Sequence, residues 1–316
     1  YVQGLDGQLI VPYIKGTSYI HVGRIPQRAM ESLPHERSEC CGYGGEVMYR
    51  DWTEIIKLNQ TLEMKMKRIA LLILGILVNT AIASDSGFSK TEKKIKQAMQ
   101  SELRTEKDIK RDANRLPLET LEFFGFRESM KVIELLPGGG WYTKLLAPTL
   151  ANNGEFFVAM GTGRVSKNLI GKKGMDFLSI INDNANIRKE KGAKFYSVDQ
   201  FELGEKDVDM IFTFRNYHNF GFEGRKTMNE AAFKALKSGG IYAVVDHTRR
   251  HMQDLDKENG RRIDPVLAIK EIQDAGFVLV DYSTLHARSA DALKYEVGHK
   301  DVTGKTDRFT IKFKKP

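Results

Sequence analysis

The feature that most constrains the fold is a short apolar segment that runs directly into a glycine-rich turn, over residues 131–143 (KVIELLPGGGWYT). The apolar half is typical of a buried strand and is interrupted by Glu134. Gly138, Gly139 and Gly140 follow, and glycine reaches positive φ without strain and has no Cβ to keep a ligand away. A glycine turn that leads into a helix holds backbone N–H groups close to a nucleotide. The segment therefore predicts a nucleotide-type ligand site at the first βα turn of an α/β domain, in preference to a plain connecting turn.

Two common nucleotide motifs do not fit this turn. The dinucleotide fingerprint G-x-G-x-x-G needs a third glycine and an acidic residue about 20 positions later. Thr143 stands in the third position, and the next expected strand ends in Met160-Gly161 without a carboxylate. The stretch around Gly171-Lys172 lacks the first glycine of a phosphate loop. A nicotinamide oxidoreductase is therefore the least favoured of the nucleotide-binding functions.

Strand-like and helix-like segments alternate along the chain. Expected strands lie at about 131–136, 155–160, 194–198, 208–214, 240–246, 277–286 and 307–314, and expected helices at about 89–111, 117–124, 141–150, 175–184, 225–237 and 265–275. Ser89 begins a capping-box pattern, Pro117 and Gly125 bracket the second helix, and Asp264-Pro265 form an N-cap and first-turn pair. The alternation predicts a parallel sheet with right-handed crossovers. We expect the first two helices to cap the sheet edge and the mouth of the ligand site.

The segment 134–140 is similar to the acidic-x-G-x-G-x-G motif of the class I S-adenosylmethionine (SAM) methyltransferases, with Leu136 in place of the first glycine. Later segments resemble the fourth, fifth, sixth and terminal strands of that family: 208–214, 236–246, 275–282 and 308–313. Four segments, 134–143, 213–219, 245–247 and 306–316, look like the predicted exported methyltransferases of Gram-negative bacteria, and the resemblance covers roughly residues 88–316. It implies a doubly wound, seven-stranded, mostly parallel Rossmann-like sheet with an antiparallel terminal strand, and SAM as the cofactor.

In such a sheet the ligand lies beyond the carboxyl ends of the strands. The residues that the resemblance implies for cofactor binding are Glu134, Pro137, Gly138, Gly139, Gly140, Asp199, Asn216 and Asp246. Glu134 and the glycines would hold the methionine end and the ribose, and Asp199 would contact the adenine amino group. A helix cap or a turn is an equally good explanation of Asp199. Asp176 or a backbone group would have to replace the missing acid after the second strand.

Three residues are candidates for catalysis. His218 and His247 could act as bases for an oxygen or nitrogen acceptor, because histidine titrates near neutral pH. A buried structural role is as good an explanation for each histidine. Arg215 could bind an acidic group of the substrate through its planar fork. No metal site is expected.

Residues on either side of the glycine turn have two possible roles. Trp141 and Tyr142 could stack on a ligand, but packing against the cap helices explains them at least as well. Arg111, Asp112 and Arg115 could reach the mouth of the site, although an exposed, salt-bridged helix face is the preferred interpretation.

The segment 64–83 has the pattern of a secretory signal peptide. A basic stretch at 65–68 precedes 15 apolar residues that end in Ala81-Ile-Ala83. The apolar run is shorter than the roughly 20 residues that cross a membrane, so an uncleaved anchor is the lesser alternative and no stable span is expected after cleavage. We interpret residues 1–63 as non-native or disordered upstream sequence and residues 84–316 as the methyltransferase-like domain, periplasmic or secreted.

Composition narrows the possible partners. The formal net charge is +8, but basic and acidic residues are interspersed and no nucleic-acid motif is present. The two cysteines, Cys40 and Cys41, precede the expected domain, which fits an oxidising compartment. The sequence therefore favours an exported SAM-dependent methyltransferase with a small or envelope-associated substrate. The alternative is an exported α/β binding protein without transfer activity, because SAM is made in the cytoplasm and the Leu136 substitution and missing acid weaken the cofactor motif.

Overall fold

The computed structural model describes residues 87–181, 184–256 and 258–316. The expected signal peptide, the segment before it and both cysteines lie outside these residues. Within the described residues, no helix has both the length and the apolar character needed to cross a bilayer.

The centre of the fold is a seven-stranded sheet with the order β3-β2-β1-β4-β5-β7-β6. Its strands are β1 (Lys131–Leu135), β2 (Glu155–Ala159), β3 (Leu178–Ile180), β4 (Val208–Phe214), β5 (Leu236–His247), β6 (Val278–Ser283) and β7 (Arg308–Lys314). Strands β1 to β5 pair in parallel, and β7 lies between β5 and β6 and is antiparallel to both. The expected doubly wound, mostly parallel sheet with an antiparallel terminal strand is confirmed, and this is the class I methyltransferase-like Rossmann fold.

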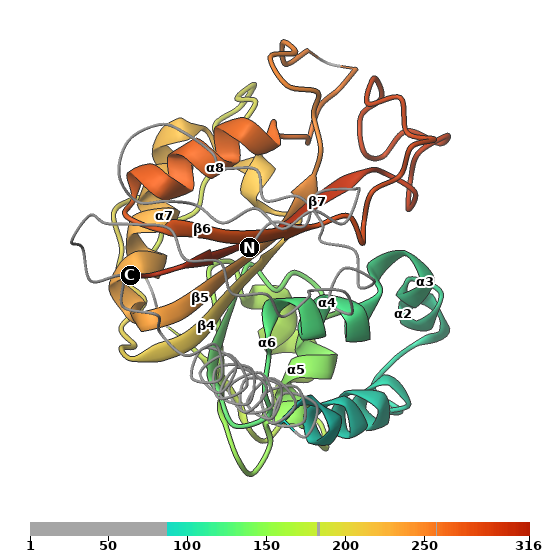
Figure 1. Ribbon diagram of the computed structural model, residues 1–316, viewed down its shortest axis with the longest axis vertical. Helices are drawn as coiled ribbons and strands as arrows, with labels where there is room; N and C mark the ends of the chain where they lie inside the picture. The colour runs from blue at the N-terminus through green and yellow to red at the C-terminus, as the bar shows by residue number, and fades with distance from the viewer. Residues whose placement is uncertain (1–86, 182–183, 257) are drawn as a thin grey trace, which may run out of the picture. The chain divides into compact units, whose positions relative to one another are not determined.

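Helices cover both faces of the sheet (Figure 1). They are a helix over 87–99, α2 (Glu106–Ile109), α3 (Asp112–Arg115), α4 (Pro117–Phe124), α5 (Thr143–Leu150), α6 (Gly163–Leu169), α7 (Phe222–Ala235) and α8 (Pro265–Asp274), with a short 3-10 turn η2 (Tyr217–Asn219). Helices α4, α5 and α6 lie on one side and α7 and α8 on the other. Strand β4 shows why two layers form: Ile211 packs into one core cluster and Met210 and Phe212 into the other, so both faces are buried.

Most of the predicted helix boundaries are confirmed. Asp264 caps α8, since its Oδ1 accepts a hydrogen bond from the Val266 N–H at 2.9 Å, and Pro265 occupies the first helical position. Gly125 ends α4 with φ 80°, a conformation that glycine reaches without the steric cost of a Cβ.

The single helix predicted over 89–111 is wrong. The first helix already includes residue 87, so Ser89 lies inside its first turn, and it ends at 99. The side chain of Arg104 then takes the place of a further helical turn. Its Nη1 donates to the Met99 carbonyl at 2.9 Å, and its guanidinium pairs with Asp112. Thr105 forms a capping box that starts α2. These side-chain contacts divide the predicted helix into two, the helix over 87–99 and α2, and α3 follows from Asp112.

Two predictions between β2 and β4 are also wrong. The segment 175–184 contains the short edge strand β3 rather than a helix, with Leu178 in register with Phe156. The crossover from β2 is the unpredicted helix α6. The expected strand at 194–198 is not part of the sheet and makes isolated bridges from Tyr196 and Ser197. Strand β3 was missed because its three residues are too few to show the period of a strand in the sequence.

Candidate functional site

A cavity of about 610 Å³ opens at the carboxyl ends of β1, β4 and β5, next to α3 and the start of β7. Seven of the predicted site residues line it: Glu134, Pro137, Gly138, Gly139, Arg215, Asn216 and His247. The other four, Gly140, Asp199, His218 and Asp246, do not line it. The topology therefore brings the β1 turn and the ends of β4 and β5 to one site, as the strand-end argument predicts.

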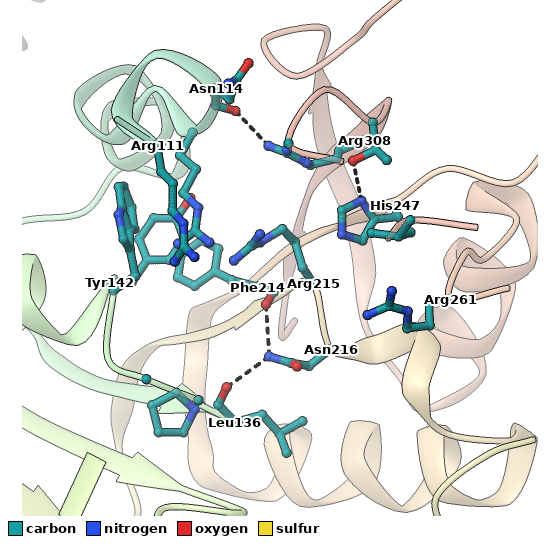
Figure 2. A pocket seen from close by; sticks show the side chains of 18 of the residues that line it. Arg111, Asn114, Leu136, Tyr142, Phe214, Arg215, Asn216, His247, Arg261 and Arg308 are labelled. Atoms are coloured by element: carbon teal, nitrogen blue, oxygen red, sulfur yellow. Dashed lines mark hydrogen bonds between the residues drawn. The ribbon is translucent and has the colours of Figure 1, made fainter. Parts of the chain in front are cut away.

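The turn after β1 is held in a strained form by an asparagine after β4. Leu136 has φ 55° and Arg215 has φ 59°, and such conformations in non-glycine residues persist where the surrounding structure holds them. Asn216 joins these two strand ends, because its Nδ2 donates to the Leu136 carbonyl at 2.9 Å and to the Phe214 carbonyl at 3.0 Å (Figure 2). The position that resembles the first glycine of the motif thus has the backbone conformation that favours glycine, although leucine occupies it.

The three glycines have different surroundings. A Cβ on Gly139 would meet no atom within 4 Å, so this position faces open space in the cavity. The N–H groups of Gly138 and Gly139 make no hydrogen bond with any described residue. A Cβ on Gly140 would come within 2.5 Å of Leu169 Cδ1. Gly138 and Gly139 are thus free to approach a ligand, whereas Gly140 allows close packing of the turn on α6.

Glu134 lies in the wall of the cavity and is almost fully buried, with 3% of its surface exposed. Thr143 Oγ1 donates a hydrogen bond to its Oε2 at 2.6 Å. Burial raises the pKa of the Glu134 carboxyl to about 7, against the lowering effects of the Thr143 hydrogen bond and the Arg115 charge. Near neutral pH this carboxyl can therefore be present in either protonation state.

His247 is the predicted histidine that reaches the cavity. Its Nδ1 lies 2.9 Å from Thr306 Oγ1, and its Nε2 makes no hydrogen bond within the described part of the chain. Burial, together with the charges of His218, Arg308 and Arg215, lowers the pKa of His247 well below its usual value. At neutral pH the imidazole is uncharged and has a ring nitrogen available to a ligand.

His218 and Asp246 form a buried pair behind this wall. His218 Nδ1 lies 2.5 Å from Asp246 Oδ1, and the two oxygens of Asp246 accept the backbone N–H groups of His218 at 2.8 Å and His247 at 2.6 Å. The rings of His218 and His247 have centroids 5.5 Å apart. This geometry fits a role for the pair in positioning His247 and the end of β5.

The aromatic residues after the glycines pack and line the cavity at the same time. Trp141 Nε1 donates to the Asp108 carbonyl at 2.9 Å. Tyr142 stacks on Phe214 with ring centroids 3.5 Å apart and an angle of 10° between the planes. Trp141, Tyr142 and Phe214 therefore form a fixed aromatic wall. This wall is compatible with both roles expected for Trp141 and Tyr142, stacking on a ligand and packing against the cap helices.

The expectation of an exposed, salt-bridged face at 111–115 is wrong for Arg115. Asp112 does pair with Arg104, and Arg111 is exposed. Arg115, however, is 5% exposed, lines the cavity, and places its Cζ 4.3 Å from the centre of the Trp141 ring. The αL conformation of Leu116 (φ 41°) ends α3 directly after it. Stacking on an aromatic ring explains how this cation is held there.

Arg308 is a cavity residue that the sequence reasoning did not identify. It is 6% exposed, and its Nη1 donates to the Asn114 carbonyl at 2.7 Å. The expected antiparallel direction of the last strand could have indicated that Arg308 lies at the cavity. Because β7 runs opposite to its neighbours, its first residue, not its last, lies at the edge where β5 ends.

The residues predicted for the adenosine half of the cofactor are not in the cavity. Asp199 is half-buried and pairs with Arg188 at 2.7 Å, and Asp176 is exposed. At the end of β2, a Cβ on Gly161 would meet Leu136 Cδ2 at 3.7 Å and Ile187 Cδ1 at 3.8 Å. The surroundings of this strand end are thus apolar, and no cavity carboxylate comes from β2.

No protein-family model and no curated protein matches the sequence. Among solved structures, a SAM-dependent methyltransferase from Aquifex aeolicus is 15% identical, with 63% of this chain and 89% of that chain covered and a TM-score of 0.44. The glycopeptide N-methyltransferase MtfA, solved with S-adenosylhomocysteine, is 14% identical, covering 65% and 90% with a TM-score of 0.42. The [4+2]-cyclase SpnF is 14% identical, covering 66% and 81% with a TM-score of 0.44. At these identities the similarity concerns the fold alone.

Proposed function

We propose that this protein is a SAM-dependent methyltransferase that acts on a small or envelope-associated substrate after export by the signal peptide at 64–83. The observation that carries the proposal is the open glycine turn after β1. Gly138 and Gly139 face the cavity with unused N–H groups, and the carboxyl of Glu134 lies in the same wall. A turn of this kind at the end of the first strand fits the methionine portion of the cofactor.

The chain's own residues would bind and orient the reactants. Gly138 and Gly139 would accept close approach of the cofactor, Glu134 would hold its amino group, and the Asn216 bridge would keep the turn in place. SAM supplies a methyl group on a sulfonium centre, and transfer to a good nucleophile depends mostly on alignment of donor and acceptor. The rigid aromatic wall of Trp141 and Tyr142 supports such alignment.

His247 is our proposed proton acceptor for an oxygen or nitrogen nucleophile. It is neutral at pH 7 and offers a free Nε2 next to the cavity. Its depressed pKa makes it a weak base in the unliganded protein. Proton transfer is most effective when the base has a pKa near the working pH, so this depression limits His247 as a base. We place His218 and Asp246 behind it as positioning residues.

An exported α/β binding protein without transfer activity is the second candidate. The observation in its favour is the adenosine half of the site: the end of β2 has no cavity carboxylate, and Asp199 is paired with Arg188 outside the cavity. The ribose and the adenine would then have to rely on backbone groups. The residues present fit the methionine half of SAM better than its adenosine half.

Calorimetry with the full chain separates the two candidates. We expect SAM and S-adenosylhomocysteine to bind with micromolar affinity, about −8 kcal/mol. Gly139→Leu should abolish binding, because its side chain would fill open cavity space. Gly163→Leu is the matched control, since Gly163 also has open space at its Cβ, lacks a positive φ and does not line the cavity. Absence of binding to the folded wild-type protein would exclude the methyltransferase and leave the binding protein.

A further inference from the structure

We propose that the substrate of this cavity is a small molecule with at least two anionic groups, carboxylate or phosphate, held by Arg115, Arg215 and Arg308. Calling this molecule the methyl acceptor rests on the proposed function. The anion site itself follows from the arrangement of the three guanidinium groups, which we name the arginine triad.

The triad is assembled from three separate parts of the chain. Arg115 ends α3, Arg215 follows β4, and Arg308 begins β7. All three line the cavity. In Figure 2, the side chains of Arg215 and Arg308 extend from the sheet toward the helical segment that carries Arg111 and Asn114. Convergence of like charges from three elements requires a reason, because nearby like charges destabilise one another.

The donors of the triad are almost entirely unused. Each guanidinium group carries five N–H donors. Within the described residues the three groups make one hydrogen bond, from Arg308 Nη1 to the Asn114 carbonyl. The Nε atoms of Arg215 and Arg308 are buried without a partner. Buried polar groups are normally satisfied, so these donors are arranged for an acceptor that the described residues do not supply.

Other buried arginines in the described part of the chain are neutralised. Arg104 pairs with Asp112, Arg225 with Glu271 at 2.6 Å, and Arg262 with Asp291 at 2.9 Å. Arg115 and Arg308 are equally buried, at 5% and 6% exposure, but neither they nor Arg215 pair with a described carboxylate. A buried cation without a counter-ion is costly. The fold therefore pairs its structural arginines and leaves the triad unpaired.

The electrostatics of the cavity support the same conclusion. Burial and the neighbouring charge of Arg215 lower the pKa of Arg115 to about 8 and that of Arg308 to about 10. The carboxylates near the triad offset it only in part. Asp246 raises the pKa of Arg215 and of Arg308, but its oxygens are already occupied by His218 and two backbone N–H groups. Asp108 pairs with Lys144 at 2.8 Å, and Glu134 has its pKa raised to about 7. An anionic ligand would restore the missing counter-charge.

The cofactor alone does not account for the triad. SAM has one carboxylate, and its amino and sulfonium groups are positive. One guanidinium group could bind that carboxylate, which leaves two that require anionic groups from another molecule. Arg is suited to planar, bidentate recognition of carboxylate and phosphate. A cavity of about 610 Å³ is of the size that holds a small ligand.

The test is calorimetry on the full chain with sodium pyrophosphate and sodium citrate as dianionic or more highly charged probes. Sodium acetate, at matched ionic strength, is the singly charged comparison. Each titration is run with and without saturating S-adenosylhomocysteine. Variants are Arg115→Met and Arg308→Met, and Arg115→Lys keeps the charge but loses the planar fork. Arg250→Met is the matched control, because Arg250 is exposed and does not line the cavity.

We expect pyrophosphate or citrate to bind at least tenfold more tightly than acetate, with S-adenosylhomocysteine bound at the same time. Arg115→Met and Arg308→Met should each weaken binding roughly ten- to a hundredfold, Arg115→Lys should weaken it less, and Arg250→Met should leave it unchanged. Preference for one probe distinguishes phosphate from carboxylate recognition.

Two results would overturn the proposal while leaving the proposed function intact. One is binding of S-adenosylhomocysteine without binding of either probe. The other is direct competition between the probes and S-adenosylhomocysteine, with loss of the latter in Arg115→Met, since the triad would then serve the cofactor carboxylate. Triad-dependent probe binding without any S-adenosylhomocysteine binding would support the anion site and refute the methyltransferase.

Discussion

His247 and Arg308 lie directly opposite each other in the antiparallel pairing of β5 and β7. The last residue of one strand thus faces the first residue of the other, at the edge of the sheet that bears the cavity. This places a candidate base beside a buried cation. The two functions that we assign to this edge, proton transfer and anion binding, are therefore electrostatically coupled.

The first prediction concerns that coupling. Arg308→Met should raise the pKa of His247, because the Arg308 charge contributes to its depression, with burial and His218 as the other leading causes. Binding of an anion to the arginine triad should act in the same direction. An NMR pH titration of the histidine ring protons measures both effects, with His247→Gln used to assign the signal. Arg250→Met should leave the titration unchanged, and an equal shift in that control would contradict the assigned cause.

The second prediction is that an arginine of the cavity destabilises the unliganded protein. Arg115→Met should raise the free energy of unfolding by about 1 kcal/mol or more, because methionine keeps the contact with Trp141 and removes an uncompensated buried charge. Arg262→Met is the matched comparison and should lower it by about 3–5 kcal/mol, since Asp291 would remain buried without its partner. Chemical denaturation measures both. A loss of stability in Arg115→Met similar to that in Arg262→Met would show that Arg115 is structural.

The third prediction is a pH dependence of stability due to Glu134. Its carboxyl titrates near 4.5 in the unfolded chain and near 7 in the folded protein. Between these values the folded state holds the extra proton, so this group's contribution to the unfolding free energy falls as pH rises, by about 3 kcal/mol in all.

Glu134→Gln removes that dependence. Stability of the variant relative to wild type should therefore increase between pH 4.5 and pH 8, as followed by denaturation at each pH. The difference isolates Glu134 from buried histidines such as His286, whose pKa is lowered to about 4 and whose effect has the opposite sign. A constant difference across this range would contradict the raised pKa.

The fourth prediction concerns the bridge between the ends of β1 and β4. Asn216→Ala removes two hydrogen bonds, to the carbonyls of Leu136 and Phe214, and should lower the unfolding free energy by roughly 1–3 kcal/mol. It should also weaken cofactor binding, because the glycine turn loses its support. Asn153→Ala, at an exposed asparagine, should change stability by less than about 0.5 kcal/mol. Equal stability of the two variants would show that the bridge does not hold the turn.

Much of the fold could be predicted from local pattern. The near-continuous apolar run of β4 and the Asp264-Pro265 start of α8 are strong signals, because burial on both faces and capping are properties of neighbouring residues. The failures have a common origin. The three-residue strand β3 is recognisable only from its pairing with β2, and the helix expected over 89–111 is interrupted by a contact between Arg104 and Asp112 that periodicity does not show.

By itself, the sequence determined the glycine turn after β1, the order of strands and helices, and the strand ends where a ligand site should lie, because these depend on conformational preference and apolar period. Only the tertiary structure decided which charged groups share that site. Arg115 ends α3, whereas Arg308 begins β7 near the end of the chain, and their meeting depends on the antiparallel insertion of β7. Whether an arginine is exposed, paired or buried alone is a property of packing between distant elements, and no local pattern records it.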